Sequence, residues 1–326
     1  MKAIVYTNYG PPDVLRLKEV EKPVPKENEV LIKVHATTVN RTDCATIRAK
    51  PFFMRIATGL FRPKKQLPGT EIAGEVEAVG TNVSSLQEGD KVFGFDDQGS
   101  GAHAEYMTIN EEMVVTMPDK LSYEQAAGSF EGVHYAYNFI NKVDLQKGDH
   151  VLIKGATGDI GSAAVQLLND YDVNVTAVCA TENMELVKTL GADRVIDYTK
   201  EDFTQDNQTY VVVFDTVGKS SFFKSKDLLK PGGVYLSSDL GYLAQNIYLP
   251  FITPLLKPFI AGKKALFPMP VDVRKSLLLV KGLIEEGKFK AVVDRTYPFE
   301  QIAEAYRYVE KGHKTGNVVI TVEHSN

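Results

Sequence analysis

Val-Leu-Ile-Lys-Gly-Ala-Thr-Gly-Asp-Ile-Gly, residues 151–161, is the stretch that decides the fold of this chain. Residues 151–153 predict a short buried strand, the glycines predict a turn, and residues 162–168 predict a helix. A glycine at position 158 lets the backbone approach a pyrophosphate closely, and Gly161 lets the helix pack tightly on the sheet. The N-terminus of that helix offers N–H groups and a partial positive charge to phosphates. The stretch therefore predicts a dinucleotide-binding turn, with a plain glycine turn as the alternative.

The turn departs from the G-x-G-x-x-G pattern at one position. Ala156 stands where the first glycine is expected, and Gly155 comes directly before it. The strand and the helix on either side supply the context that the pattern requires. We therefore assign the whole turn to cofactor binding: Gly155, Ala156, Thr157, Gly158, Asp159, Ile160 and Gly161.

The end of the next strand indicates which dinucleotide is bound. An NAD site places Asp or Glu there, about 20 residues after the glycines, to hold the ribose hydroxyls. Here the strand of residues 174–178 leads into Cys179, and no acidic residue stands at positions 179–181. A carboxylate would repel a 2′-phosphate, whereas Thr181, Asn183 and Tyr198 can donate hydrogen bonds to one. The residues favour NADP(H), although a neighbouring glutamate and the lack of an arginine count against it.

Composition limits the class of protein. The chain has 326 residues, of which 44% are hydrophobic and 24% charged, so it is long enough for two domains. Its net charge is −5 without a basic block, which argues against nucleic acid as a partner. The two cysteines are far apart, which excludes a disulfide scaffold or a cysteine-rich zinc site. No signal peptide and no apolar run of about 18 residues is present, so we expect a cytoplasmic protein.

Two regions of different character follow from the residue patterns. Residues 1–122 predict β-strands separated by Gly, Pro and Asn turns, which together suggest a small, partly open barrel. Within them, residues 44–67 predict a packed loop with a short helix, or a wall over a substrate pocket. Residues 123–270 alternate between strand and helix and predict an α/β domain, a doubly wound parallel sheet of the Rossmann type. Ser122 and Gln125 predict a capping box at its start.

The last part of the chain, residues 271–326, predicts two helices and two strands that return to the first domain. We expect helices at residues 273–286 and 299–311, and strands near residue 292 and at residues 317–322. The preceding segment, residues 242–262, is apolar but is interrupted by prolines and a lysine. It therefore predicts a surface helix or lid and no membrane span, and we do not expect contact with a membrane.

Several motifs resemble those of one family. The chain is similar to the zinc-independent quinone oxidoreductase branch of the medium-chain dehydrogenase/reductase superfamily over nearly its whole length. The motifs are VNRTD (39–43), PGTEIAGEVEAVG (68–80), EGDKVFG (88–94), the glycine turn, LGAD (190–193), VIDY (195–198), FDTVG (214–218), LKPGG (229–233) and KTGNVV (314–319). The resemblance implies a GroES-like β-barrel domain, a Rossmann domain that binds the cofactor, and a homodimer.

The positions that hold catalytic zinc in other members of the superfamily differ in this chain. The resemblance places a zinc-binding Cys at Asn40, a His at Thr70 and the third ligand near Glu131. Asn and Thr are poor zinc ligands, and Glu131 alone cannot hold the metal. We therefore expect no metal, and without a Lewis acid the acceptor must already be activated by conjugation. The predicted function is transfer of hydride from NADPH to a quinone or an α,β-unsaturated carbonyl.

Three residues are candidates for the chemistry. The resemblance places Asn40 at the cofactor, where its amide can donate to the carboxamide, the ribose or the substrate, with a turn-stabilising asparagine as the alternative. His134 and Tyr135 lie where the family contacts the nicotinamide, and either can donate a proton, with core packing as the alternative. By the same resemblance we assign further cofactor contacts to Asp215, Val217, Gly218, Ser237, Lys314 and Asn317.

Three other functions stay open at this point. A zinc-dependent alcohol dehydrogenase would need the missing ligands. A non-catalytic nucleotide-binding protein that associates with membranes finds its support in the apolar residues 242–262. A reductase domain of a larger synthase-like protein is the remaining alternative.

Overall fold

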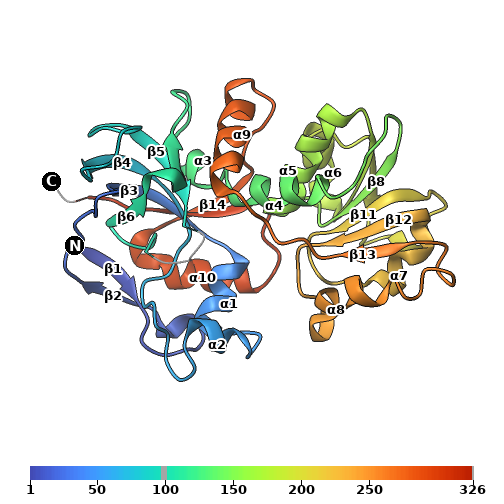
Figure 1. Cartoon of the computed structure of the whole chain (residues 1–326), viewed down its shortest axis with the longest axis horizontal. Coiled ribbons are helices and arrows are strands. Elements are labelled where there is room, and N and C mark those ends of the chain that lie inside the picture. Colours follow the sequence, from blue (N-terminus) through green and yellow to red (C-terminus); the bar gives the residue numbers. More distant parts are fainter. Residues whose placement is uncertain (97–100, 325–326) are drawn as a thin grey trace. The chain divides into compact units, whose positions relative to one another are not determined.

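The first of two compact units is built on a mixed sheet. The computed structural model describes residues 1–96 and 101–324, and the chain divides into unit 1 (Met1–Glu131 and Asp272–Asn326) and unit 2 (Gly132–Val271) (Figure 1). In the described part of unit 1 the strand order is β14-β15-β3-β4-β5-β7, and β6 also pairs with β3. These strands are β3 (Glu29–Val39), β4 (Glu71–Val79), β5 (Lys91–Phe95), β6 (Tyr106–Asn110), β7 (Val114–Thr116), β14 (Val293–Pro298) and β15 (Asn317–Thr321). A hairpin of β1 (Lys2–Val5) and β2 (Arg16–Glu19) lies beside them.

The helices of unit 1 are α1 (Arg41–Arg48), α2 (Met54–Thr58), α3 (Tyr123–Ala127), α9 (Val273–Glu285) and α10 (Ile302–Glu310). Of these, α3, α9 and α10 pack on the strands of the sheet. Helix α10 buries Ile302, Ala305, Tyr306 and Val309, which recur every three or four residues and so form one apolar face. That face packs into the same core as Ile32 of β3. Residues 272–326 are thus part of unit 1.

Helix α3 corrects the predicted domain boundary. We expected residues 123–131 to belong to the nucleotide domain, but α3 packs on β3, β4 and β5 and is part of unit 1. The predicted capping box is present, because the side chains of Ser122 and Gln125 each bond the backbone of the other. A capping box predicts where a helix starts, but it does not indicate which sheet the helix packs on. At the other boundary, Val271 belongs to unit 2.

Unit 2 is a doubly wound parallel sheet, as predicted. Its strands pair in the order β10-β9-β8-β11-β12-β13, and every neighbouring pair is parallel. They are β8 (His150–Lys154), β9 (Asn174–Cys179), β10 (Arg194–Asp197), β11 (Tyr210–Asp215), β12 (Leu229–Ser237) and β13 (Lys264–Leu266). The chain reverses its winding between β8 and β11, and ligands of such sheets bind at the carboxyl ends of the two strands that flank this point.

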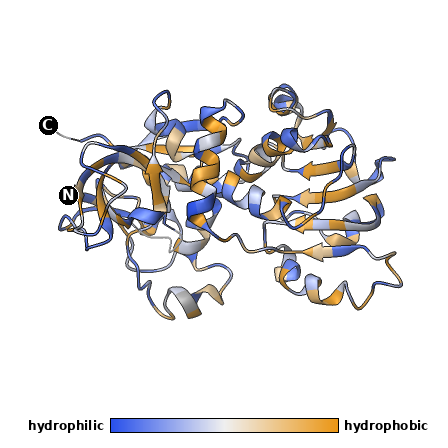
Figure 2. Ribbon diagram, turned by 45° about the horizontal axis from the view of Figure 1, so that its top comes forward, coloured by the Kyte–Doolittle hydropathy of each residue, from blue (hydrophilic) through white to orange (hydrophobic). Residues whose placement is uncertain are grey.

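The strands of unit 2 are largely hydrophobic, as Figure 2 shows, because both faces of the sheet are covered. The helices are α4 (Glu131–Ile140), α5 (Asp159–Leu168), α6 (Met184–Thr189), α7 (Phe222–Ser225) and α8 (Gln245–Ile252). Helix α5 begins at Asp159, three residues before the predicted start, because the glycine turn is tighter than expected. Strand β13 ends at Leu266, and Pro268 and Pro270 beyond it cannot donate to a strand ladder.

The apolar residues 242–262 form the surface helix α8, with Pro250 inside it, and the turns that follow. Within the described residues, the helices are all too short or too polar to cross a bilayer.

Candidate functional site

The turn between β8 and α5 is shaped by its three glycines. Gly155 has a φ of +79°, and a Cβ there would lie 2.1 Å from Cγ2 of Val217. A Cβ on Gly161 would lie 2.1 Å from the carbonyl oxygen of Gly155, so only glycine lets α5 approach the strand end. A Cβ on Gly158 would meet only that same oxygen, at an ordinary 3.5 Å. Gly158 therefore has open space around it, whereas its two neighbours in the motif are required by the fold.

Helix α5 presents its N-terminus at this turn. Gly158 is the N-cap and carries no side chain that could satisfy the first N–H groups of the helix. Asp159 brings a carboxylate close to the turn, which by itself would repel a phosphate. Its Oδ1 atom, however, lies 2.3 Å from the place of a Cβ on Gly132, so the carboxylate faces the start of α4. The turn and the helix end thus fit a pyrophosphate, while the buried Ala156 points into the core.

Substitutions at these glycines separate folding from cofactor binding. We expect Gly161→Ala to lower the free energy of unfolding by about 2 kcal/mol, because a backbone oxygen must move. We expect Gly158→Ala to leave unfolding nearly unchanged but to weaken NADPH binding at least tenfold, because its methyl group fills the open space. Urea unfolding and NADPH fluorescence titration measure the two effects. Gly282→Ala in α9, with nothing within 4 Å of the new Cβ, is the control and should change neither quantity adversely. Unchanged NADPH affinity in Gly158→Ala would remove the turn from the cofactor site.

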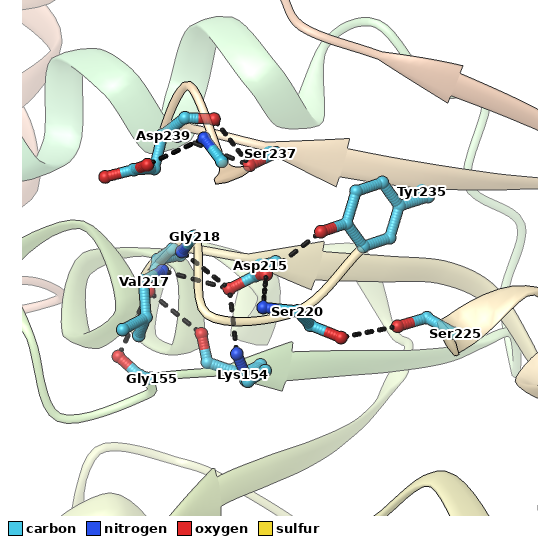
Figure 3. A network of polar contacts seen from close by, with 12 residues as sticks. Lys154, Gly155, Asp215, Val217, Gly218, Ser220, Ser225, Tyr235, Ser237 and Asp239 are labelled. Carbon is cyan, nitrogen blue, oxygen red and sulfur yellow. Dashed lines mark hydrogen bonds and ion pairs between the residues drawn. The ribbon is translucent and has the colours of Figure 1, made fainter. Parts of the chain in front are cut away.

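Asp215 organises the carboxyl end of β11. Its side chain is fully buried and accepts hydrogen bonds from the backbone N–H groups of Val217, Gly218 and Ser220, at 3.0–3.1 Å (Figure 3). The Tyr235 hydroxyl donates to it at 2.9 Å. These bonds fold the chain after β11 into a tight turn around the carboxylate. Asp215, which we predicted to contact the cofactor, is therefore placed to position the Val217–Gly218 backbone.

Lys154 joins this network from the end of β8. Its Nζ lies 3.4 Å from Oδ1 of Asp215, and the lysine side chain is largely buried. Burial lowers the pKa of the Lys154 ammonium, and the carboxylate of Asp215 opposes that shift. Burial raises the pKa of Tyr235, so this phenol stays a donor to the carboxylate. Thr216 donates to the carbonyl oxygens of Lys154 and Gly155, which ties the β11 turn to the glycine turn.

A second polar cluster lies at the end of β12. Ser237 is buried and donates to the carbonyl oxygen of Asp239 at 3.0 Å, and the Asn246 amide donates to the Ser237 hydroxyl at 2.9 Å. Gly218 has a φ of +71°, and a Cβ there would lie 2.3 Å from Oδ1 of Asp239. The predicted cofactor residues Gly218 and Ser237 thus come together at neighbouring strand ends (Figure 3).

The predicted 2′-phosphate site contains an acidic residue that we did not anticipate. Asp197, the last residue of β10, pairs in register with Cys179 and accepts a hydrogen bond of 2.5 Å from Thr181. Bonds from Thr181 and Thr199 hold the pKa of Asp197 well below its usual range, and Lys200 lies 3.3 Å away. The Thr181 hydroxyl therefore donates to protein. Burial raises the pKa of the Cys179 thiol to about 11, so it stays neutral.

Asn40 in unit 1 is the N-cap of α1. Its Oδ1 accepts from the backbone N–H of Asp43 at 2.8 Å, and its own N–H donates to the Asp43 carboxylate at 3.0 Å. Its Nδ2 donates to the hydroxyl of Thr70 at 3.1 Å. The residue thus serves as the turn-stabilising asparagine that was the alternative to a catalytic role. The amide nevertheless has a second N–H available from the same nitrogen.

The residues at positions 40, 70 and 131 do not fit a zinc ion. A neutral amide and a hydroxyl occupy two of them, bonded to each other. Glu131 accepts from Thr42 at 3.4 Å, and its backbone N–H donates to Glu71 at 2.8 Å. Zinc prefers thiolate, imidazole or carboxylate. Elsewhere in residues 1–96 and 101–324, His, Cys, Asp and Glu side chains nowhere gather in a group of three that could hold a metal.

The other predicted residues are tied to their own units. His134 in α4 is buried, and its Nδ1 lies 3.4 Å from the amide of Asn138, which favours the core-packing alternative. Tyr135 packs beside it, with ring centroids 6.0 Å apart. In unit 1, the buried Asn317 donates to the carbonyl of Gly128 at 2.9 Å, and Lys314 donates to the carbonyl of Gly316. These residues hold backbone in place, and their roles toward a cofactor stay predictions.

Comparison with known proteins decides the family. Residues 26–119 match the family described as the alcohol dehydrogenase GroES-like domain, and residues 190–320 match zinc-binding dehydrogenase. The chain is 33% identical over 332 residues to an NADPH-dependent alkenal/one oxidoreductase, chloroplastic, from Arabidopsis thaliana, with 98% of this chain and 79% of the relative covered. The chain belongs to the medium-chain dehydrogenase/reductase superfamily.

Within the superfamily it falls in the quinone oxidoreductase-like branch. It is 29% identical to the human quinone oxidoreductase, with 98% of this chain and 97% of the relative covered. The structure of the quinone oxidoreductase from Coxiella burnetii matches with a TM-score of 0.84 at 28% identity, covering 99% of each chain. The resemblance and the fold class predicted from the sequence are confirmed. The zinc named in one family description concerns residues 190–320, which contain none of positions 40, 70 and 131.

Four residues of this superfamily member were missed by the sequence analysis: Lys154, Asp197, Thr216 and Tyr235. Lys154 directly follows the predicted strand of residues 151–153, so its position at the carboxyl edge of the sheet was available as a signal, and Asp197 likewise ends β10. Their partners depend on which strands are neighbours. Tyr235 lies inside a strand that reads as apolar, and nothing in its local sequence distinguishes it from a core residue.

Proposed function

We propose that this protein reduces quinones or α,β-unsaturated carbonyls with NADPH, without a metal ion. The bound cofactor would supply a hydride to the conjugated acceptor. The relatives described above support a nicotinamide cofactor and this acceptor class. The choice of NADPH over NADH rests on the hydroxyl and amide groups after β9. The carboxylate of Asp197 counts against this choice, because it would repel a 2′-phosphate.

The chain's own residues take three parts in this proposal. The N-terminus of α5 and the open space at Gly158 receive the pyrophosphate. The turn held by Asp215 positions backbone N–H groups at the carboxyl end of β11. The Asn40 amide offers a neutral hydrogen-bond donor for the negative charge that develops on a carbonyl oxygen, and water or a nearby side chain then supplies the proton.

The observation that carries the proposal is the hydrogen-bonded pair of Asn40 and Thr70. Two neutral groups, which bond each other at 3.1 Å, stand where metal-using members of the superfamily have ligands. A neutral donor can stabilise an enolate whose charge is already spread by conjugation. It is a poor substitute for a Lewis acid in the oxidation of a simple alcohol.

A spectrophotometric screen tests this function. NADPH and NADH are each offered with quinones, alkenals, enones and simple aldehydes, and oxidation is followed at the nicotinamide band. We expect turnover with conjugated acceptors, at least tenfold higher kcat/KM with NADPH than with NADH, and none with simple aldehydes. A preference for NADH would contradict the cofactor assignment, and reduction of simple aldehydes would contradict the acceptor class.

Asn40→Ser tests the site in the same assay. Serine keeps the N-cap acceptor for Asp43, so α1 should remain capped and thermal unfolding nearly unchanged. The variant lacks the amide donor, and kcat for enones should fall about 10- to 100-fold. Unchanged kcat would leave Asn40 with its structural role alone.

The homodimeric state and cytoplasmic location expected from the sequence are also part of the proposal.

A further inference from the structure

Residues 50–65 carry an exposed apolar surface on unit 1. Phe52, Ile56 and Phe61 expose 69%, 80% and 85% of their surface, and Phe53 and Leu60 are also exposed. We call these five side chains the α2 surface. Scattered single apolar residues are normal on a protein, but a run of large ones within one short segment marks a place of interaction.

The segment is held in place from its inner side. The hydroxyl of Tyr9 lies 2.8 Å from that of Thr58 and donates to the carbonyl of Gly59 at 2.8 Å. The guanidinium of Arg55 lies 5.0 Å from the ring centroids of Tyr9 and Phe52. The backbone N–H of Lys64 donates to the carbonyl of Thr58 at 2.9 Å. These polar contacts face the protein, and the apolar side chains are left facing solvent.

The segment that carries the α2 surface has charged residues of one sign only, although one of them, Arg48, is paired with Glu310 of α10. Residues 44–70 contain no Asp or Glu, although the whole chain has a net charge of −5. The same stretch contains six basic residues: Arg48, Lys50, Arg55, Arg62, Lys64 and Lys65. Lys50, Arg62 and Lys64 are exposed, and the structure pairs none of them with a carboxylate among residues 1–96 and 101–324.

We propose that the α2 surface binds peripherally to membranes rich in anionic lipid. An anionic membrane suits both kinds of side chain. The apolar side chains can enter the headgroup region, and the cations can face the lipid phosphates. A second copy of the chain fits less well, because a two-fold interface centred here would set these cations against their own copies. The proposal departs from our sequence-based expectation, which weighed only residues 242–262. It does not depend on the proposed function, since vesicle binding requires no turnover.

Flotation with lipid vesicles tests the proposal. The full chain should float with vesicles of phosphatidylcholine and phosphatidylglycerol (3:1), and at most weakly with phosphatidylcholine alone. Each cation near an anionic surface contributes about fivefold to partitioning, so Lys50→Glu/Arg62→Glu/Lys64→Glu should lower it at least 100-fold. Phe52→Ser/Ile56→Ser/Phe61→Ser should lower it at least tenfold. Raising the salt concentration should weaken binding of the wild type.

Matched variants keep the test specific. Lys18→Glu/Lys120→Glu/Lys311→Glu makes the same change in net charge at exposed positions elsewhere in unit 1 and should float like the wild type. Phe251→Ser/Leu255→Ser/Phe259→Ser removes exposed apolar residues after and within α8 and should also keep binding. Thermal unfolding shows that each variant is folded. Equal binding to neutral vesicles, loss of binding only in the α8 variant, or an α2 variant that changes self-association but not flotation would each overturn the proposal.

Discussion

Asp215→Ala should be the most destabilising single substitution considered for this protein, with a loss of about 3–5 kcal/mol in the free energy of unfolding. The carboxylate is fully buried and accepts from three backbone N–H groups, a tyrosine hydroxyl and the Lys154 ammonium. Removing it leaves a buried cation and several donors without their acceptor, and each such group costs its desolvation. Urea unfolding followed by circular dichroism measures the loss.

Two further variants show which part of the network matters. Lys154→Met/Asp215→Ala removes the unpaired cation as well, and should recover part of the stability lost in the single variant. Glu185→Ala is the control, because its ion pair with Lys188 is exposed and worth less than about 1 kcal/mol. A loss in Asp215→Ala as small as that of the control would show that the carboxylate does not hold the turn together.

Two buried titratable groups near Asn40, Asp43 and His103, should make the free energy of unfolding depend on pH in opposite directions, so that their effects partly cancel. Asp43 is buried at the start of α1, and burial raises its pKa to about 7. His103 is fully buried, and burial lowers its pKa to about 4. Its Nε2–H donates to the carbonyl of Thr38, and its Nδ1 lies 3.3 Å from the Tyr306 hydroxyl, so the neutral ring satisfies both neighbours.

The signs of the two contributions are opposite. Folded Asp43 holds its proton up to about pH 7 whereas the unfolded chain loses it near 3.8, so stability falls as the pH rises between these values. Folded His103 binds a proton only near pH 4 whereas the unfolded chain binds one near 6.5, so stability falls as the pH drops between these values. Between pH 5 and pH 8, Asp43 changes the free energy of unfolding by about 3 kcal/mol and His103 changes it by about 2 kcal/mol in the opposite direction.

Asp43→Asn and His103→Gln should uncover these contributions. The free energy of unfolding of Asp43→Asn, taken relative to the wild type at the same pH, should be about 3 kcal/mol higher at pH 8 than at pH 5, because ionisation of the buried carboxylate no longer costs free energy. For His103→Gln the same difference should be about 2 kcal/mol higher at pH 5 than at pH 8. Urea unfolding at half-unit pH steps measures both slopes. Parallel profiles of the variants and the wild type would refute the pKa shifts.

The fold could be predicted from the sequence wherever a pattern is local. The β-branched strand of residues 151–153, its glycines and the apolar helix after them are contiguous, and the structure has them with a shift of three residues at the start of α5. The boundary at residue 123 was wrong because a capping box locates the end of a helix and is silent about its packing.

The candidate site was predictable only in part, for the same reason. The glycine turn is one stretch of chain, and its geometry follows from residue type. The network of Asp215 joins residues from β8, β11 and β12, so it requires the order of strands in the sheet. Asp197 is another case, since it reaches Thr181 across a strand pair. A carboxylate contributed by the neighbouring strand is invisible to a rule that inspects only the end of β9.

The pairing of β15 with β3 bears on how the protein folds during synthesis. Unit 2 is one continuous stretch of chain, so all its strands can pair as soon as residue 271 has left the ribosome. Unit 1 must wait, because residues 36–39 of β3 pair with β15, a strand that is translated only after the whole of unit 2. Until then this part of the β3 edge is open to other strands, and a nascent chain stalled before residue 317 is exposed to aggregation there.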